Sequence, residues 1–122
     1  MREPQPGTAA LIPAGGSLTT LSGGTTNNNW RVDVDGRPVA VLREPASDDG
    51  LLGIARAVEQ RAARQASAAG VAPPVLATAA SGAMLTGWVD AAPMRPDALL
   101  DTDFRARLTH LLRRLHAGLG AW

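Results

Sequence analysis

The sequence contains no cysteine and no lysine, and aromatic residues make up only 3% of it. The absence of cysteine excludes disulfides and thiolate metal sites, and it leaves the redox compartment unreadable. Because apolar residues still make up 45% of the chain, a core can be built, mainly from Leu, Val, Ile and Ala. All twelve cations are arginines, so any site that needs a positive charge must use Arg.

The sequence also lacks blocks of one charge and long apolar runs. Twelve cations and eleven acids are mixed along the chain, which argues against the clustered basic face of a nucleic-acid-binding protein. Residues 1–16 show no basic start followed by an apolar run, so no secretory signal is visible. No apolar stretch approaches the roughly 20 residues that span a bilayer. We therefore expect a cytoplasmic protein with no nucleic-acid or membrane partner.

The first half of the chain predicts three strands. Residues 1–17 are rich in Pro and Gly and predict a flexible leader, and a short strand follows over residues 18–22. Apolar and polar residues alternate over residues 30–35, as in a half-buried strand. Asp35-Gly36 is a strong hairpin signal, so residues 39–43 form the third strand.

A helix is predicted over residues 51–69. The sequence Ser-Asp-Asp-Gly at residues 47–50 offers an N-cap, and Gly70 closes the helix before two prolines. The apolar side chains recur at spacings of three and four; they are Leu51, Ile54, Val58, Ala62 and Ala66.

Two short strands and a last helix complete the pattern. Residues 75–80 and 83–89 are strand candidates joined by Ser81-Gly82, a hairpin pair. After a connector, Asp101 can cap a helix over residues 102–117. The fold class is α+β, with a five-stranded antiparallel sheet, one packed helix and a trailing helix. We divide the chain into a leader (1–17), a sheet-and-helix unit (18–89) and a connector with the last helix (90–122).

Arg43 has the most informative setting among the candidate site residues. Residues two apart on a strand share a face, so Arg43 points the same way as Val39 and Val41. A cation beside two valines is unusual unless an anion awaits it. The alternative is that Arg43 ends the strand and extends into water.

The loop that begins at Gly23 and the helix residue Glu59 add two weaker signals. Glycine lets backbone N–H groups approach phosphates closely, and Thr and Asn add donors; the alternative is an ordinary polar hairpin loop. Glu59 can pair with Arg43 and hold it for a phosphate. The alternative, which the spacing alone favours, is a solvated helix residue that can pair with Arg56 three positions earlier.

Four segments resemble choline and ethanolamine kinases, of the aminoglycoside phosphotransferase superfamily. The resemblance covers about residues 18–117 and lies in the order and spacing of the segments together. The segments are Gly23-Gly24-Thr25-Thr26-Asn27 with Asn29-Trp30-Arg31-Val32, Val39-Ala40-Val41-Leu42-Arg43, Arg56-Ala57-Val58-Glu59 with Ala69-Gly70-Val71-Ala72-Pro73, and Leu115-His116.

This resemblance implies the N-terminal, ATP-binding lobe of a kinase-like fold. Val41 would touch the adenine, Arg43 would contact the phosphates in place of the usual Lys, Glu59 would hold Arg43, and the hinge would lie at Trp88 and Val89. The implied nucleotide-binding residues are Gly23, Gly24, Thr25, Thr26, Asn27, Val41, Arg43, Glu59, Trp88 and Val89. The implied cofactor is ATP with Mg²⁺.

The sequence does not contain the family's His-x-Asp-x-x-x-x-Asn catalytic loop. We therefore assign no catalytic and no metal-binding residue, and we place the Mg²⁺ ligands in a large lobe that this sequence lacks. The intact enzyme would transfer the γ-phosphate of ATP to a small alcohol such as choline or ethanolamine, and this chain is expected to be inactive by itself. The alternative is a stand-alone, non-catalytic nucleotide-binding or protein-interaction module.

The apolar stripe of the last helix, Phe104 to Leu115, has no obvious partner in so small a unit. Each large apolar side chain gains roughly 1.5–3 kcal/mol on full burial. We expect the helix either to fold back over the sheet or to leave an exposed face that drives self-association.

Overall fold

The computed structural model describes residues 2–46 and 53–119. It contains a five-stranded, wholly antiparallel sheet in the order β1-β2-β3-β5-β4, which confirms the predicted fold class. The strands are β1 (Ser17–Leu21), β2 (Asn27–Val34), β3 (Arg37–Pro45), β4 (Val75–Thr78) and β5 (Met84–Gly87).

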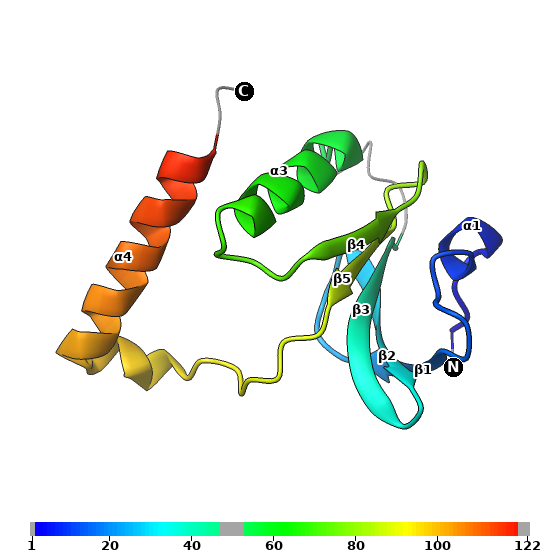
Figure 1. Cartoon of the computed structure of the whole chain (residues 1–122), viewed down its shortest axis with the longest axis horizontal. Coiled ribbons are helices and arrows are strands. Elements are labelled where there is room, and N and C mark those ends of the chain that lie inside the picture. The colour runs from blue at the N-terminus through cyan, green and yellow to red at the C-terminus, as the bar shows by residue number, and fades with distance from the viewer. Residues whose placement is uncertain (1, 47–52, 120–122) are drawn as a thin grey trace.

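Helices lie on both sides of this sheet. In Figure 1, α1 and α3 flank the sheet from opposite sides, whereas α4 stands apart from the strands at the end of an extended connector. The helices are α1 (Pro6–Ala9), α3 (Arg56–Ala68) and α4 (Thr102–Gly118), with a short 3₁₀ turn, η1 (Pro96–Leu100), before α4. Within the described residues, no helix is both long and apolar enough to cross a membrane.

The β2–β3 hairpin forms where the sequence predicts it. Asp35 and Gly36 both have positive φ, at 51° and 74°, as the tight turns that match strand twist require. The pairing then shifts by one residue, because Val32 pairs with Ala40 and Asp33 with Pro38. This bulge leaves Val39 without a partner on β2 and keeps Pro38 in the hairpin.

The core lies on one face of the sheet. Strand alternation brings five buried side chains together there: Trp30, Val32, Ala40, Leu42 and Leu85. Leu11 and Ile12, from the segment after α1, pack against this cluster. The core therefore depends on residues from before β1.

Residues 2–16 differ from the flexible leader that the sequence predicted, because they pack on the core face. The Trp30 indole Nε1 donates to the Arg2 carbonyl at 3.2 Å, and the Gln5 N–H donates to the Glu44 carboxylate at 2.8 Å. Thr8 is buried as well. The physical reason is that Trp30 and its neighbours form an apolar face that some segment must cover.

The helix α3 ends as predicted but begins later. The predicted N-cap at residues 47–50 lies outside the described residues. The helix starts at Arg56 after Ala55, which makes no side-chain cap, so Ile54 precedes it. At its end, Gly70 has φ +72°, and the N–H groups of Val71 and Gly70 bond the carbonyls of Ala66 and Ser67. These two bonds form a Schellman motif.

The predicted apolar stripe of α3 is wrong at Val58, which is 51% exposed. Polar side chains face the sheet instead. Gln60 donates from Nε2 to the carbonyls of Ala79 and Ala83 at 3.0 and 3.2 Å, on either side of the β4–β5 turn. The helix is therefore attached to the sheet largely by hydrogen bonds and ion pairs.

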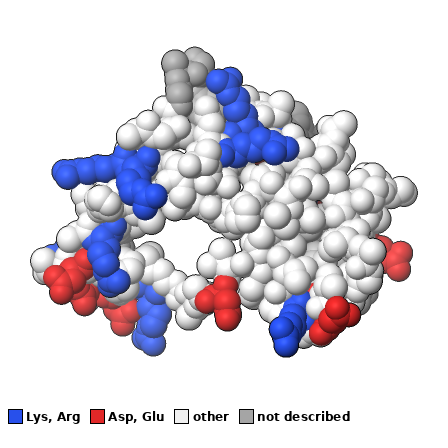
Figure 2. Space-filling view, viewed as in Figure 1, with Lys and Arg blue, Asp and Glu red and all other residues white. Residues whose placement is uncertain are grey.

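The last helix begins at its predicted cap, because Asp101 accepts from the Phe104 N–H at 3.0 Å. It does not fold back over the sheet: Figure 2 shows a gap between α4 with its connector and the strands. Its described contact with α3 includes Arg114, which donates to the Ala69 carbonyl at 2.9 Å. Leu111 and Leu112 remain 41% and 42% exposed.

The apolar side chains exposed on α4 support the expectation that the chain self-associates, which stays a prediction. Light scattering of the purified chain should show a mass that rises with concentration, because apolar faces of this kind associate. Replacing Leu111 and Leu112 by Glu should give a monomer. The matched control places Glu at the exposed Ala106 and Ala117, on the other side of the helix, and should still associate. A wild-type chain that stays monomeric throughout would refute the prediction.

Glu44 should stabilise the fold through its bond to the Gln5 N–H, because a hydrogen bond to a charged group contributes about 1.5–3 kcal/mol. We expect Glu44→Ala to lower the free energy of unfolding in urea by that amount. Glu44→Gln keeps an acceptor oxygen and should therefore lower the free energy of unfolding by less. Glu3→Ala, at an exposed position of the same segment, should have no effect. Equal stability of the Glu44→Ala and Glu3→Ala variants would contradict this role.

Candidate functional site

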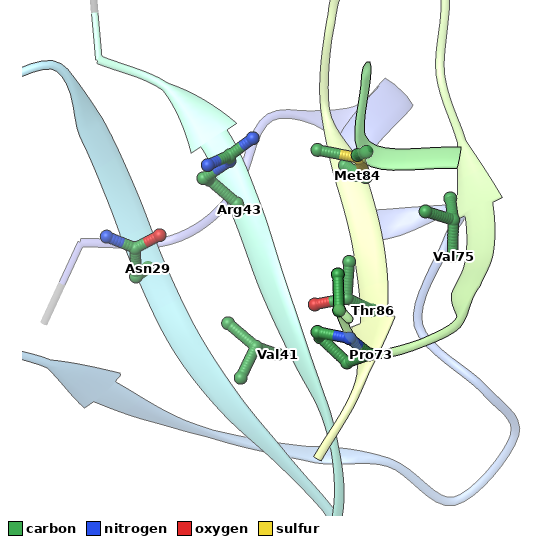
Figure 3. Close-up of a pocket in the computed structure, with 9 residues that line it drawn as sticks. Asn29, Val41, Arg43, Pro73, Val75, Met84 and Thr86 are labelled. Atoms are coloured by element: carbon green, nitrogen blue, oxygen red, sulfur yellow. The ribbon is translucent and has the colours of Figure 1, made fainter. Parts of the chain in front are cut away.

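A hollow of about 270 Å³ lies on the sheet face opposite the core. Strand register explains its composition, since Arg43 pairs with Asn29 on β2 and with Met84 on β5, and paired residues share a face. Figure 3 shows these side chains on neighbouring strands around the hollow. Its lining residues are Asn29, Val41, Arg43, Ala63, Ala72, Pro73, Val75, Met84 and Thr86.

Arg43 and Glu59 form an ion pair at the α3 side of this hollow. The pair that the sequence predicted is therefore present. Arg56 also pairs with Glu59, through Nη1 to Oε2 at 2.7 Å. Both ion pairs that the sequence suggested for Glu59 are therefore present, because its carboxylate lies between the two arginines.

Arg43 gives this cluster a partly exposed cation. Among the described residues, the guanidinium groups of Arg43 and Arg56 both contact the Glu59 carboxylate. A guanidinium carries five N–H donors and stays protonated in proteins. The Arg43 side chain is 32% exposed, so donors beyond those used by Glu59 can reach a ligand in the hollow.

The glycine-led loop borders a second, smaller hollow of about 130 Å³, whose lining includes Gly23, Gly24 and Asn27. Asn29 lines both hollows, so the loop adjoins the Arg43 hollow. Gly23 has φ +96°, and no atom lies within 4 Å of where its Cβ would be. The loop backbone at Gly23 is therefore open to a ligand. Thr25 and Thr26 line neither of these two hollows.

Arg56 was not predicted as a site residue, yet it contacts the loop directly. Its Nη1 donates to Asn27 Oδ1 at 2.9 Å, and its Nη2 donates to the Thr26 carbonyl at 3.3 Å. These partners lie 29 and 30 positions away in the sequence. The sequence signal was limited to the spacing of three between Arg56 and Glu59.

Trp88 and Val89 lie beside the Arg43 hollow and do not line it. The Trp88 N–H donates to the Val39 carbonyl at 3.0 Å, continuing the β3–β5 pairing. Val89 borders a shallow depression that shares Ala72 and Pro73 with the hollow. The position suits a hinge, and the role of these two residues stays a prediction.

The residues present suit phosphate oxygens better than a metal ion. Cationic donors and an open glycine are the groups that bind phosphate. Across residues 2–46 and 53–119, no three His, Cys, Asp or Glu side chains gather to form a metal site. A five-stranded sheet with a helix whose Glu pairs with the β3 cation is the small lobe of a kinase-like fold.

Comparison with solved structures narrows this class. A choline/ethanolamine kinase family protein from Mesorhizobium loti is 37% identical to the chain, with a TM-score of 0.68. The match covers 94% of this chain and 38% of that one. Over nearly its whole length the chain therefore resembles part of a choline/ethanolamine kinase family protein, as the sequence predicted, and it spans less than half of that relative.

Two further comparisons found nothing: no protein-family model matches the chain, and no curated protein matches it.

Gly23→Ala should disturb the loop through backbone conformation, since space for the methyl group is open. Holding a residue other than Gly at positive φ costs about 1–3 kcal/mol. We expect a loss of that size in urea unfolding, or a rearranged loop detected by shifted amide resonances for Gly24 and Asn27. Gly7→Ala, where the methyl also meets no atom and φ is ordinary, is the control. Loop resonances and stability unchanged in Gly23→Ala would contradict the prediction.

Proposed function

We propose that this chain is the ATP-binding lobe of a small-molecule phosphotransferase. The observation that carries the proposal is the ion pair between Arg43 and Glu59 beside a hollow that Arg43 itself lines. A cation held in this way is pre-organised for phosphate, because its carboxylate partner limits the orientations of the guanidinium. The similarity to a choline/ethanolamine kinase family protein supports the same assignment.

Each part of the site has a proposed role. Arg43 contacts the phosphates, Glu59 holds Arg43, and Val41 packs against the adenine. The loop of Gly23, Gly24, Thr25, Thr26 and Asn27 cradles the phosphates with backbone and side-chain donors. The backbone at Trp88 and Val89 bonds the adenine edge.

The size of the hollow indicates how much of a nucleotide it can hold. Ligand pockets typically measure about 300–1,000 Å³, and this hollow measures about 270 Å³. It can therefore enclose one part of ATP, with the phosphates continuing toward the loop past Asn29. Further walls would have to come from outside the described residues.

The reaction we propose for the complete enzyme is transfer of the ATP γ-phosphate to a small alcohol such as choline or ethanolamine. Such a transfer needs a carboxylate that orients the acceptor hydroxyl and groups that hold Mg²⁺. This sequence lacks the catalytic motif that would supply them. We therefore propose that the chain as given binds ATP without transferring phosphate.

The second candidate function is a non-catalytic nucleotide-binding or protein-interaction module. The observation that favours it is the exposed apolar side of α4. Both candidates share the ATP site, so they differ in what covers α4 and in whether transfer activity appears when the missing lobe is supplied.

Arg43→Ala should abolish most of the affinity for ATP while the fold persists, because the side chain is a third exposed and outside the core. A hydrogen bond to a charged group is worth about 1.5–3 kcal/mol, so we expect a roughly 10- to 150-fold weaker Kd by calorimetry. Arg64→Ala is the control, since Arg64 lies on α3 and bonds Thr78. Its affinity should match the wild type.

Two outcomes would refute the proposed function. One is a wild-type chain that shows no binding of ATP at millimolar concentrations. The other is an Arg43→Ala variant that binds ATP as tightly as the Arg64→Ala control. Circular dichroism of each variant establishes that the fold is retained.

A further inference from the structure

We infer that Arg56 is a positioning residue that fixes the phosphate loop relative to Arg43. The inference rests on the proposed function for its consequence in ATP binding, and on the contacts of Arg56 for its physical basis. Arg56 bonds Asn27 and Thr26 of the loop and also bonds Glu59, the partner of Arg43. One side chain therefore joins the two parts of the phosphate site.

The carboxylate of Glu59 divides its oxygens between the two arginines. Oε1 contacts Arg43 and Oε2 accepts from Arg56 at 2.7 Å. A displacement of Arg56 would therefore move the group that holds Arg43. The Glu59 carboxylate therefore connects Arg56, which bonds the loop, to Arg43, which we propose contacts the phosphates.

The packing of Arg56 restricts it to this position. Its side chain is only 11% exposed. Gly82, in the β4–β5 turn, lies so close that an added Cβ would come within 2.7 Å of both Cβ and Cγ of Arg56. The methylene stem thus fills the space that a larger residue at Gly82 would need, and the guanidinium is held at the loop.

Arg56 also sets the orientation of the Asn27 amide. A guanidinium can only donate, so the Asn27 atom that faces it must be the oxygen. The amide nitrogen of Asn27 then donates to Thr26 Oγ1, at 3.2 Å. Because the Thr26 hydroxyl accepts this bond, its own hydrogen is available for another acceptor such as a phosphate oxygen.

Arg56 and Ala46, the residue after β3, both donate to the same loop carbonyl. The Thr26 carbonyl accepts from Arg56 and from the Ala46 N–H, at 3.3 and 3.1 Å. The Ala46 amide is therefore a reporter of loop position that needs no ligand. If Arg56 restrains the loop, its removal should make this amide exchange faster with solvent.

The first test measures amide hydrogen exchange in the unliganded chain. In Arg56→Met, which keeps most of the stem, we expect the Ala46 amide to exchange on the order of tenfold faster, since a charged hydrogen bond to the loop is lost. The Trp88 amide, bonded to Val39 at the other end of β3, should be unchanged. Arg64→Met is the matched control and should leave both amides unchanged.

The second test compares ATP with adenosine by calorimetry. If Arg56 positions the phosphate loop, the Arg56→Met substitution should weaken the affinity for ATP about tenfold and leave the affinity for adenosine unchanged. Arg56→Lys keeps the charge but replaces the planar guanidinium by a single ammonium nitrogen on a flexible chain, so we expect an intermediate loss. If Arg56→Met does not fold, the same measurements are made on Arg56→Lys.

The two proposals can fail separately. If the wild type does not bind ATP, the proposed function is refuted, and Ala46 exchange still decides whether Arg56 positions the loop. Ala46 exchange unchanged in both Arg56 variants would overturn the inference. An equal loss of ATP and adenosine affinity would overturn it too, because it would indicate general destabilisation and not control of the phosphate end.

Discussion

The site depends on one carboxylate, that of Glu59, held between two guanidinium groups. Arg43 reaches it from β3 and Arg56 from the first turn of α3. Without a carboxylate at this position, two cations would lie close together in a partly buried setting, and like charges there repel strongly. Glu59 thus fixes α3 against the sheet and orients Arg43 toward the hollow. The partly exposed guanidinium of Arg43 is the group that we propose to contact phosphate.

The two faces of the sheet have different tasks. One face is apolar and is covered by the segment that carries α1, through Leu11 and Ile12. The other face carries Val41 and Arg43 and stays hollow under α3. Alternation along β3 produces both faces from one strand, because Ala40 and Leu42 are buried while Val41 and Arg43 line the hollow. The hollow can exist because the core on the opposite face stabilises the sheet.

Much of the fold could be predicted from the sequence because its signals are local. The Asp35-Gly36 turn, the Gly70 helix end and the Asp101 cap all depend on residues close in the chain, and each lies where it was predicted. The shared face of Val41 and Arg43 follows from strand alternation alone.

The features that the sequence did not reveal depend on long-range contacts. Residues 2–16 are anchored by bonds to Trp30 and Glu44 across 28 and 39 positions. The site role of Arg56 likewise comes from partners across the fold, Asn27 and Thr26. No periodicity or motif in a single segment carries such information. The start of α3 was placed too early because Ile54 fits the apolar spacing of the helix but precedes its first residue, Arg56.

The most direct test of the central claim is a nuclear magnetic resonance titration of the unaltered chain with ATP. If the Arg43 face binds the nucleotide, the Arg43 Nε–H and the amides of Gly23 and Gly24 should shift together and saturate with one Kd. The Leu11 amide, in the segment that covers the opposite face of the sheet, should not shift. Shifts that begin at Leu11 and leave Arg43 unchanged would place any nucleotide on the wrong face of the sheet and contradict the assignment.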